Sequence, residues 1–227
     1  MTADPDAERL LERVRRFAMP DRDVAPCAVR LVQEGEMRLA PDRPWRPFRA
    51  EQRMAGETLD FRWTASFRMT PLAPVRVTDA FENGAGRLDV RAFGLLPMAR
   101  ARGPEIDRGE ILRAVAELPW RPFAFRDAAH LTWTAEGPNA LRAVFDDGRL
   151  RTSVALEIDG EGRVLGGSAG RPRLVGKTAV ETAWSGTFGD YRAFGPVHVP
   201  ATAEVAWLLR DGPFAYWRGR ITAYELL

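Results

Sequence analysis

The residues best suited to chemistry lie between positions 105 and 117, where acidic side chains surround one arginine. Glu110, Arg113 and Glu117 follow one another at spacings of three and four, so they share one face of a helix. If this face is exposed, the charges pair along a solvated helix. If it faces the interior, Arg113 and Glu117 line a pocket, and Glu117 and Glu105 are candidate acid or base groups of an enzyme that acts on a small polar substrate. The sequence leaves both orientations open.

Tryptophan gives the second signal. The chain has seven tryptophans, and Trp63, Trp133 and Trp207 each stand in a segment that alternates apolar and polar residues. If these strands share a sheet, the rings project to its covered face. They then pack as plain core, or they line an apolar cavity where a curved sheet is too open for one helix to fill. In the second case Arg113 meets an acidic head group. The predicted ligand-binding residues are Phe61, Trp63, Arg113, Glu117, Trp133 and Trp207.

Motifs for other kinds of chemistry are missing from the sequence. It contains no Gly-x-Gly-x-x-Gly segment after a strand, no Gly-Lys-Ser/Thr loop and no His-x-x-x-His. The two histidines, His130 and His198, stand far apart, and Cys27 is the single cysteine. Cys27 with either histidine is a conceivable nucleophile pair, although a lone cysteine is more often a packed core residue. We therefore predict no catalytic residue, no metal and no cofactor, and the sequence favours a protein that is not an enzyme.

Composition is that of a folded protein. The chain has 227 residues, of which 45% are hydrophobic and 28% charged. Lys177 is the only lysine among 33 basic residues, but 31 acidic residues hold the net charge at +2, and no dense basic run offers a nucleic-acid surface. No apolar stretch approaches the roughly 20 residues that span a bilayer. Because the first residues are acidic and polar, unlike a secretory leader, we expect a cytoplasmic protein. The oligomeric state stays open.

The elements that position these residues are mostly strands. Residues 5–17 form an amphipathic helical pattern, whereas residues 59–69 alternate apolar and polar positions throughout, as a strand with one buried face does. Asn83-Gly84 and Asp147-Gly148 stand between strand-like segments and favour tight hairpin turns. A second helix is expected after Asp107-Arg-Gly-Glu110, which has the form of an N-terminal cap.

These elements predict a single domain over residues 1–227. It comprises an N-terminal helix in 1–20, a first group of strands in 28–104, a helix in 106–118 and a second group of strands in 120–227. The expected fold class is mainly β (α+β), with a large curved antiparallel sheet whose concave side is covered by one or two helices. The pentapeptide Pro-Trp-Arg-Pro-Phe occurs at 44–48 and again at 119–123. It is either the trace of a duplication or, as we favour, two rigid segments that lead into strands.

Residues spread along almost the whole chain carry a resemblance to a known family. They are Trp45-x-Pro-Phe-x-Ala50-x-Gln52, Phe61-x-Trp63-x-Ala65, Asp79-x-Phe81-x-x-Gly84-x-Gly86, Gly103-x-Glu105-Ile106, Glu110-x-x-Arg113-x-x-x-Glu117-x-x-Trp120-x-Pro122, Trp184-x-Gly186, Pro200, Glu204-x-x-Trp207 and Gly212-x-x-x-Tyr216. In order and spacing they resemble an uncharacterised bacterial domain-of-unknown-function family. The strand pattern is also similar to the architecture of the lipoprotein-localisation factors. That likeness implies an unclosed antiparallel barrel with an apolar cavity for acyl chains.

Three functions follow as hypotheses. The first is a non-catalytic protein that binds a hydrophobic ligand, a lipid or acyl chain, between the sheet and its helices. The second is a carboxylate-based enzyme that acts on a small substrate. The third is a protein-interaction module that makes contact through an exposed sheet face or Trp217.

Overall fold

A single antiparallel sheet of thirteen strands forms the body of the protein. The computed structural model describes residues 4–21, 23–70, 73–176 and 178–227, so Lys177 lies outside the described residues. The order of the strands across the sheet is β6-β5-β4-β3-β2-β1-β13-β12-β11-β10-β9-β8-β7. The strands are β1 (Val29–Met37), β2 (Arg46–Met54), β3 (Phe61–Thr70), β4 (Ala73–Glu82), β5 (Ala85–Ala92), β6 (Leu96–Ala101), β7 (Leu131–Gly137), β8 (Ala140–Asp146), β9 (Arg151–Ile158), β10 (Val164–Val175), β11 (Thr178–Phe194), β12 (Val197–Leu209) and β13 (Gly212–Leu226).

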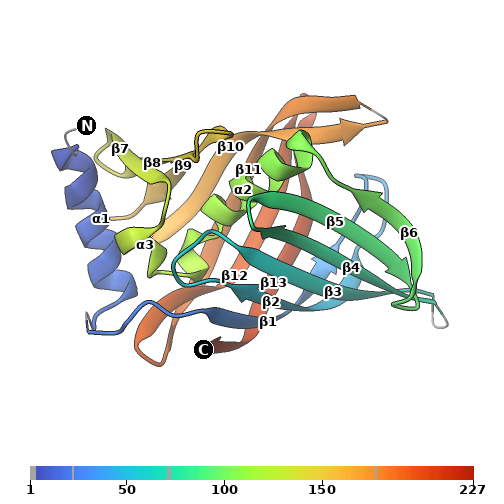
Figure 1. Ribbon diagram of the computed structural model, residues 1–227, viewed down its shortest axis with the longest axis horizontal. Coiled ribbons are helices and arrows are strands. Elements are labelled where there is room, and N and C mark those ends of the chain that lie inside the picture. Colours follow the sequence, from blue (N-terminus) through green and yellow to red (C-terminus); the bar gives the residue numbers. More distant parts are fainter. Residues whose placement is uncertain (1–3, 22, 71–72, 177) are drawn as a thin grey trace.

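The path of the chain explains why a helix lies inside the sheet. Strands β1 to β6 run outward to one edge, and β7 to β13 return from the opposite edge until β13 pairs with β1. The segment between β6 and β7 must therefore cross from edge to edge. Helix α2 (Pro104–Ala116) makes this crossing, packed against β4 and β5 on one side and β9 and β10 on the other (Figure 1). This curled sheet around a helix confirms the predicted mainly β fold class.

The helix boundaries refine the prediction. Helix α1 (Pro5–Ala18) agrees with the amphipathic pattern, begins at the side-chain cap of Asp4, and packs against β7, β8, β12 and α3 (Ala124–Asp127). The predicted cap of α2 at Asp107 is wrong. Gly103 precedes the helix, Pro104 starts it, and Asp107 instead accepts a hydrogen bond from the Gly86 amide at 2.7 Å. Proline is favoured at the first helical position because the N–H group that it lacks would have no hydrogen-bond partner within the helix there.

The two hairpin signals have different outcomes. Asn83 and Gly84 both have positive φ angles, 53° and 75°, and form the tight turn between β4 and β5. Between β8 and β9 the loop is longer, and only Gly148 has a positive φ angle. There the carboxylate of Asp147 accepts hydrogen bonds from the backbone amides of Arg149 and Leu150. A short polar side chain of this kind stabilises a wider loop in place of a two-residue turn.

The repeated pentapeptide adopts two structures. Residues 44–48 lead into β2, as predicted, but residues 119–123 do not lead into a strand. Leu118–Trp120 form the 3-10 helix η1, and α3 follows before β7 begins. The second copy is fully buried against the core, so the same five residues take a helical turn where tertiary packing requires one.

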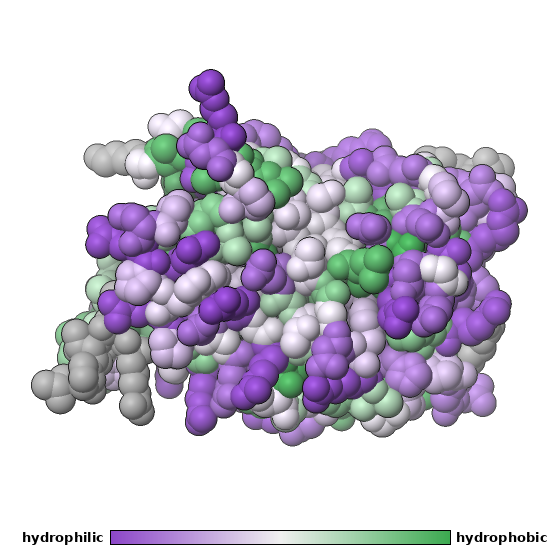
Figure 2. Space-filling model, turned by 180° about the vertical axis from the view of Figure 1, so that it is seen from behind, coloured by the Kyte–Doolittle hydropathy of each residue, from purple (hydrophilic) through white to green (hydrophobic). Residues whose placement is uncertain are grey.

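The core fills the space between the concave face of the sheet and its helices. Side chains of α2, of η1 and of strands from both halves of the sheet form one continuous apolar cluster. The face opposite to that of Figure 1 is mainly hydrophilic, with small hydrophobic patches between charged side chains (Figure 2). None of the helices within the described ranges is long and apolar enough to cross a membrane.

Candidate functional site

A cavity of about 260 Å³ lies between α2 and the concave face of the sheet. Its apolar wall includes four tryptophan rings: Trp63 from β3, Trp120 from η1, Trp184 from β11 and Trp217 from β13. All four rings are buried. The pairing register of β13 with β12 shifts between Val205 and Ala206, and Tyr216 and Trp217 both line the cavity although they are adjacent in sequence.

The polar wall is centred on Arg113 of α2. Its Nη1 donates to Asp79 Oδ2 at 2.6 Å and its Nε donates to Glu117 Oε1 at 2.8 Å. The guanidinium also lies over the rings of Phe61 and Trp63, 5.0 and 5.1 Å from their centroids. Burial alone would lower the pKa of Arg113, but the adjacent Glu117 and Asp79 carboxylates outweigh burial and raise it above its usual range. Arg113 is therefore permanently charged and already paired.

Glu117 has both carboxylate oxygens occupied. Its Oε1 accepts from Arg113, and its Oε2 accepts from Gln52 Nε2 at 2.5 Å. Because β2 supplies Gln52 and β4 supplies Asp79, the side chains of α2 join two strands through one buried network. A carboxylate held in this way serves structure more readily than proton transfer.

Glu110 lies one turn earlier on the same face of α2, and it is less well partnered. Its Oε1 is 3.5 Å from Arg171 Nη2, at the limit of a hydrogen bond, and its Oε2 has no partner. Burial first, and then the neighbouring Asp79 carboxylate, raise the pKa of Glu110 well above its usual range. Glu110 therefore holds a proton at a pH where an exposed glutamate has lost it.

Arg171 and Tyr216 complete the polar wall. The Tyr216 hydroxyl accepts a hydrogen bond from Trp184 Nε1 at 3.0 Å and a long one from Arg171 Nη1 at 3.5 Å. The Arg171 guanidinium also lies over the Trp184 ring, 5.5 Å from its centroid. Burial raises the pKa of Tyr216, so its hydroxyl stays neutral.

The structure brings some of the residues predicted from sequence to this cavity and leaves others elsewhere. Trp63, Arg113 and Glu117 line it. Phe61 is in the core beneath Arg113, and the two remaining rings are outside the cavity wall, each stacked on another ring: Trp133 on Phe125 and Trp207 on Tyr216.

Two further expectations are corrected by burial. Trp217, predicted as an exposed contact, is only 8% exposed, because its side chain lies on the covered face of β13 and lines the cavity. Glu105, a predicted acid or base, is exposed in the first turn of α2 and does not line the cavity. Its neighbour Ile106, in the same turn, lines the cavity instead.

Sequence reasoning missed several residues of the wall. Asp79, Trp184 and Tyr216 stood among the residues of the family resemblance, which was the only signal that marked them. Arg171 carried no signal at all, because it lies in a strand of ordinary composition that approaches α2 only in the folded chain.

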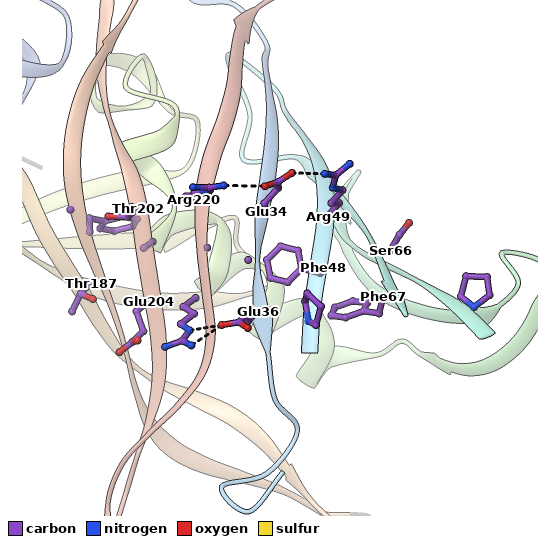
Figure 3. Close-up of a pocket in the computed structure, with 18 residues that line it drawn as sticks. Glu34, Glu36, Phe48, Arg49, Ser66, Phe67, Thr187, Thr202, Glu204 and Arg220 are labelled. Atoms are coloured by element: carbon purple, nitrogen blue, oxygen red, sulfur yellow. Dashed lines mark hydrogen bonds and ion pairs between the residues drawn. The ribbon is translucent and has the colours of Figure 1, made fainter. Parts of the chain in front are cut away.

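A larger hollow, of about 1250 Å³, is an open groove on the outer face of the sheet (Figure 3). Charged side chains cross it in pairs: Glu34 lies between Arg49 and Arg220, at 3.1 and 3.3 Å, and Glu36 pairs with Arg218 at 2.7 Å. These charged groups are in water and already neutralise one another, so each ion pair contributes little to stability. The cavity beside α2, which is the more enclosed of the two, is therefore the better candidate for a site.

Metal chemistry has no support in the described part of the chain, where no group of three or more His, Cys, Asp or Glu is placed to hold an ion.

Comparisons with known proteins agree with this fold. The chain is similar to the crystal structure of a LolA superfamily protein from Nitrosomonas europaea, with 11% identity, a TM-score of 0.50, and coverage of 97% of this chain and 93% of that one. It is also similar to a DUF1329 family protein from Desulfovibrio piger, with 11% identity, a TM-score of 0.55, and coverage of 99% and 94%. At this identity the likeness shows the fold alone.

No curated protein matches the sequence. A family model, described as a family of unknown function, matches residues 10–219. Because this match spans most of the 227 residues, the chain belongs to that family of unknown function, DUF6544.

Proposed function

We propose that this protein binds a small hydrophobic ligand, such as an acyl chain, in the cavity between α2 and the sheet. The observation that carries the proposal is the partly enclosed space itself, lined by four tryptophan rings and by a buried ionic network. Closely packed interiors leave few voids larger than a water molecule. An enclosed apolar space with a few convergent polar groups is the usual form of a ligand site.

The size of the cavity limits the ligand. A volume of 260 Å³ corresponds to roughly nine water molecules at about 30 Å³ each. Sites for drug-sized ligands are larger, about 300–1,000 Å³. We therefore propose a short aliphatic chain, either a small molecule or one chain of a larger lipid, as the part of the ligand that the cavity holds.

Native mass spectrometry, followed by solvent extraction, tests this proposal. We expect the purified protein to carry a stoichiometric adduct that extracts as an aliphatic molecule, or to gain one after incubation with mixed lipids. A protein that stays free of adduct in both cases would contradict ligand binding.

A pair of variants on β4 makes the test specific. Val77 lines the cavity, whereas its neighbour Thr78 points to the opposite face of the strand. Val77→Phe fills part of the space and is expected to abolish the adduct. Thr78→Phe adds a ring of the same size outside the cavity and is expected to retain it. If both variants carry the same amount of adduct, the ligand does not bind in this cavity.

A carboxylate-based enzyme is the second candidate, and one observation favours it. Glu110 and Asp79 face each other in the cavity, so one can hold a proton while the other accepts one. Turnover would convert an extracted ligand into a molecule of different mass during incubation with fresh protein. Recovery of the ligand unchanged would favour simple binding.

A further inference from the structure

The part of the polar wall that is removed from water has one more acidic group than basic groups. Among the side chains removed from water, Asp79, Glu110 and Glu117 carry its carboxyl groups, and Arg113 and Arg171 carry its guanidinium groups. Glu204 also borders the cavity, but it is exposed and its charge stays in water. With these five groups ionised, the part of the wall that is removed from water has a net charge of −1. A buried charge without a partner is costly, so this wall must take up one positive charge.

The two acceptor atoms that lack a donor mark where this charge belongs. Arg113 donates to Asp79 Oδ2 and to Glu117, which leaves Asp79 Oδ1 without a partner. The Glu110 Oε2 atom also has no partner, and only 8% of this side chain is exposed. Both carboxyl groups line the cavity.

In the empty protein a proton fills this position. The carboxyl groups of Glu110 and Asp79 are close enough to hydrogen-bond to each other. Two ionised carboxylates cannot form such a bond, because neither has a hydrogen to donate. A proton on Glu110 therefore allows the two carboxyl groups to hydrogen-bond and removes the excess charge.

We propose that the ligand of this cavity is a small amphipathic amine, whose ammonium group binds between Glu110 and Asp79 and replaces the shared proton. This inference rests on the proposed function, because it names the chemical class of the same ligand. An ammonium group brings the missing positive charge and three N–H donors. Its aliphatic chain packs against the tryptophan rings.

A ligand with an acidic head group fits less well. It would add a further negative charge to a wall that already has an excess of one. Arg113, the predicted receptor of such a group, already donates to Asp79 and Glu117. Arg171 has a long contact with Glu110 and another with the Tyr216 hydroxyl, and its charge balances the carboxylates.

Three probes with the same chain length test the proposal: octylamine, 1-octanol and octanoate. Each has about ten non-hydrogen atoms and so matches the cavity volume. Titration calorimetry at pH 8 is expected to show octylamine binding at least about tenfold more tightly than 1-octanol, since charge-assisted hydrogen bonds are the stronger kind. Octanoate is expected to bind most weakly.

Variants of α2 assign the effect to its residue. Glu110→Gln keeps the shape of the side chain and removes its charge, so octylamine is expected to lose its advantage while 1-octanol keeps its affinity. Glu105→Gln changes an exposed glutamate of the same helix and is expected to leave all three affinities unchanged. If Glu110→Gln does not fold, the ranking of the three probes on the unmodified protein still decides the question.

The pH dependence is a second measurement. The titratable and charged groups around Glu110 are Asp79 from β4, Arg113 from its own helix, Arg171 from β10 and Tyr216 from β13. Because the amine displaces a proton from this group, its affinity is expected to rise with pH between 6 and 9, while 1-octanol shows no such rise. Glu110→Gln is expected to flatten the profile for the amine.

The outcomes separate this inference from the proposed function. If 1-octanol or octanoate binds as tightly as octylamine, the amine proposal is overturned and hydrophobic binding stands. If none of the three probes binds, both the proposed function and this inference fail.

Discussion

At the scale of single residues, Glu110 is an acidic group that the fold has removed from water. Its side chain is 8% exposed, and its closest charged neighbours are another carboxyl group, Asp79, and two arginines, Arg113 and Arg171. Desolvation and the Asp79 carboxylate favour the neutral form of Glu110, whereas the arginines favour the ionised form. Desolvation is the largest of these effects, so the folded protein holds a proton here that the unfolded chain releases at a lower pH.

This protonation predicts how stability depends on pH. The pKa of Glu110 in the folded protein is raised above the ordinary value of 4.5. Its contribution to stability is fully present below that ordinary value and is lost as pH rises through the folded pKa. Between the two, the free energy of unfolding falls with pH by at most about 1.4 kcal/mol per unit. Urea denaturation between pH 5 and 9 is expected to show this fall in the unmodified protein but not in Glu110→Gln. Parallel profiles for the two proteins would contradict it.

At the scale of elements, Arg121 holds the end of η1 against the loop between β2 and β3. The side chain is 1% exposed and donates to backbone carbonyls of Thr58 and Ala114, both at 3.0 Å, with longer contacts to those of Leu59 and Asp60. Burial lowers the pKa of Arg121 to about 10, so it remains charged at neutral pH. One guanidinium with a fixed fork of donors can satisfy several carbonyls at once.

We predict that Arg121→Met destabilises the protein by about 3 kcal/mol or more, because each buried carbonyl left without a donor costs about 1–3 kcal/mol. Arg62→Met is the matched control: Arg62 is 53% exposed and pairs with Glu82 on the surface. Its loss is expected to cost less than about 1 kcal/mol. Urea unfolding of both variants measures the difference, and equal costs would mean that Arg121 does not tie these elements together.

At the scale of the whole molecule, the pairing of β1 with β13 joins the two groups of strands into one sheet. Gly35 stands opposite Gly219 in this pair. With no side chain at these positions, the rings of Phe48 and Trp217 lie against bare backbone and stack on each other, 5.7 Å between centroids. Because Trp217 is also part of the cavity wall, the pairing of β1 with β13 and the cavity depend on the same packing.

Gly35→Ala is therefore expected to disturb the sheet at its centre. An added Cβ would lie 2.2 Å from the Arg218 carbonyl oxygen and 2.7 Å from the Gly219 Cα, both in backbone that cannot move cheaply. Overpacking of this kind costs about 1–3 kcal/mol. Gly186→Ala in β11 is the control, since its nearest contacts would be at 3.8 Å. Thermal unfolding should show a lower Tm for Gly35→Ala alone, and an unchanged Tm would contradict the close contact.

The sequence by itself determined the local structure and the fold class. The apolar stripe of residues 5–17 predicts α1, and strict alternation over 59–69 predicts β3, because side-chain periodicity records which face of an element is covered. The residues from Trp45 to Tyr216 that carry the family resemblance also suffice to indicate the family. Element boundaries that depend on tertiary packing were harder to predict from sequence. The helix predicted at 106–118 begins at Pro104 and ends at Ala116.

Only the tertiary structure decided which residues contact the inward face of α2. The charges at 110, 113 and 117 are compatible with a solvated helix or with a buried one, and the choice depends on the chain crossing from β6 to β7 over the concave face. That path brings Asp79 and Arg171, which are 92 positions apart, to the same cavity wall. Periodicity specifies the face of each strand but not the partner across the interior, so the excess carboxyl group of the site could emerge only from the folded sheet.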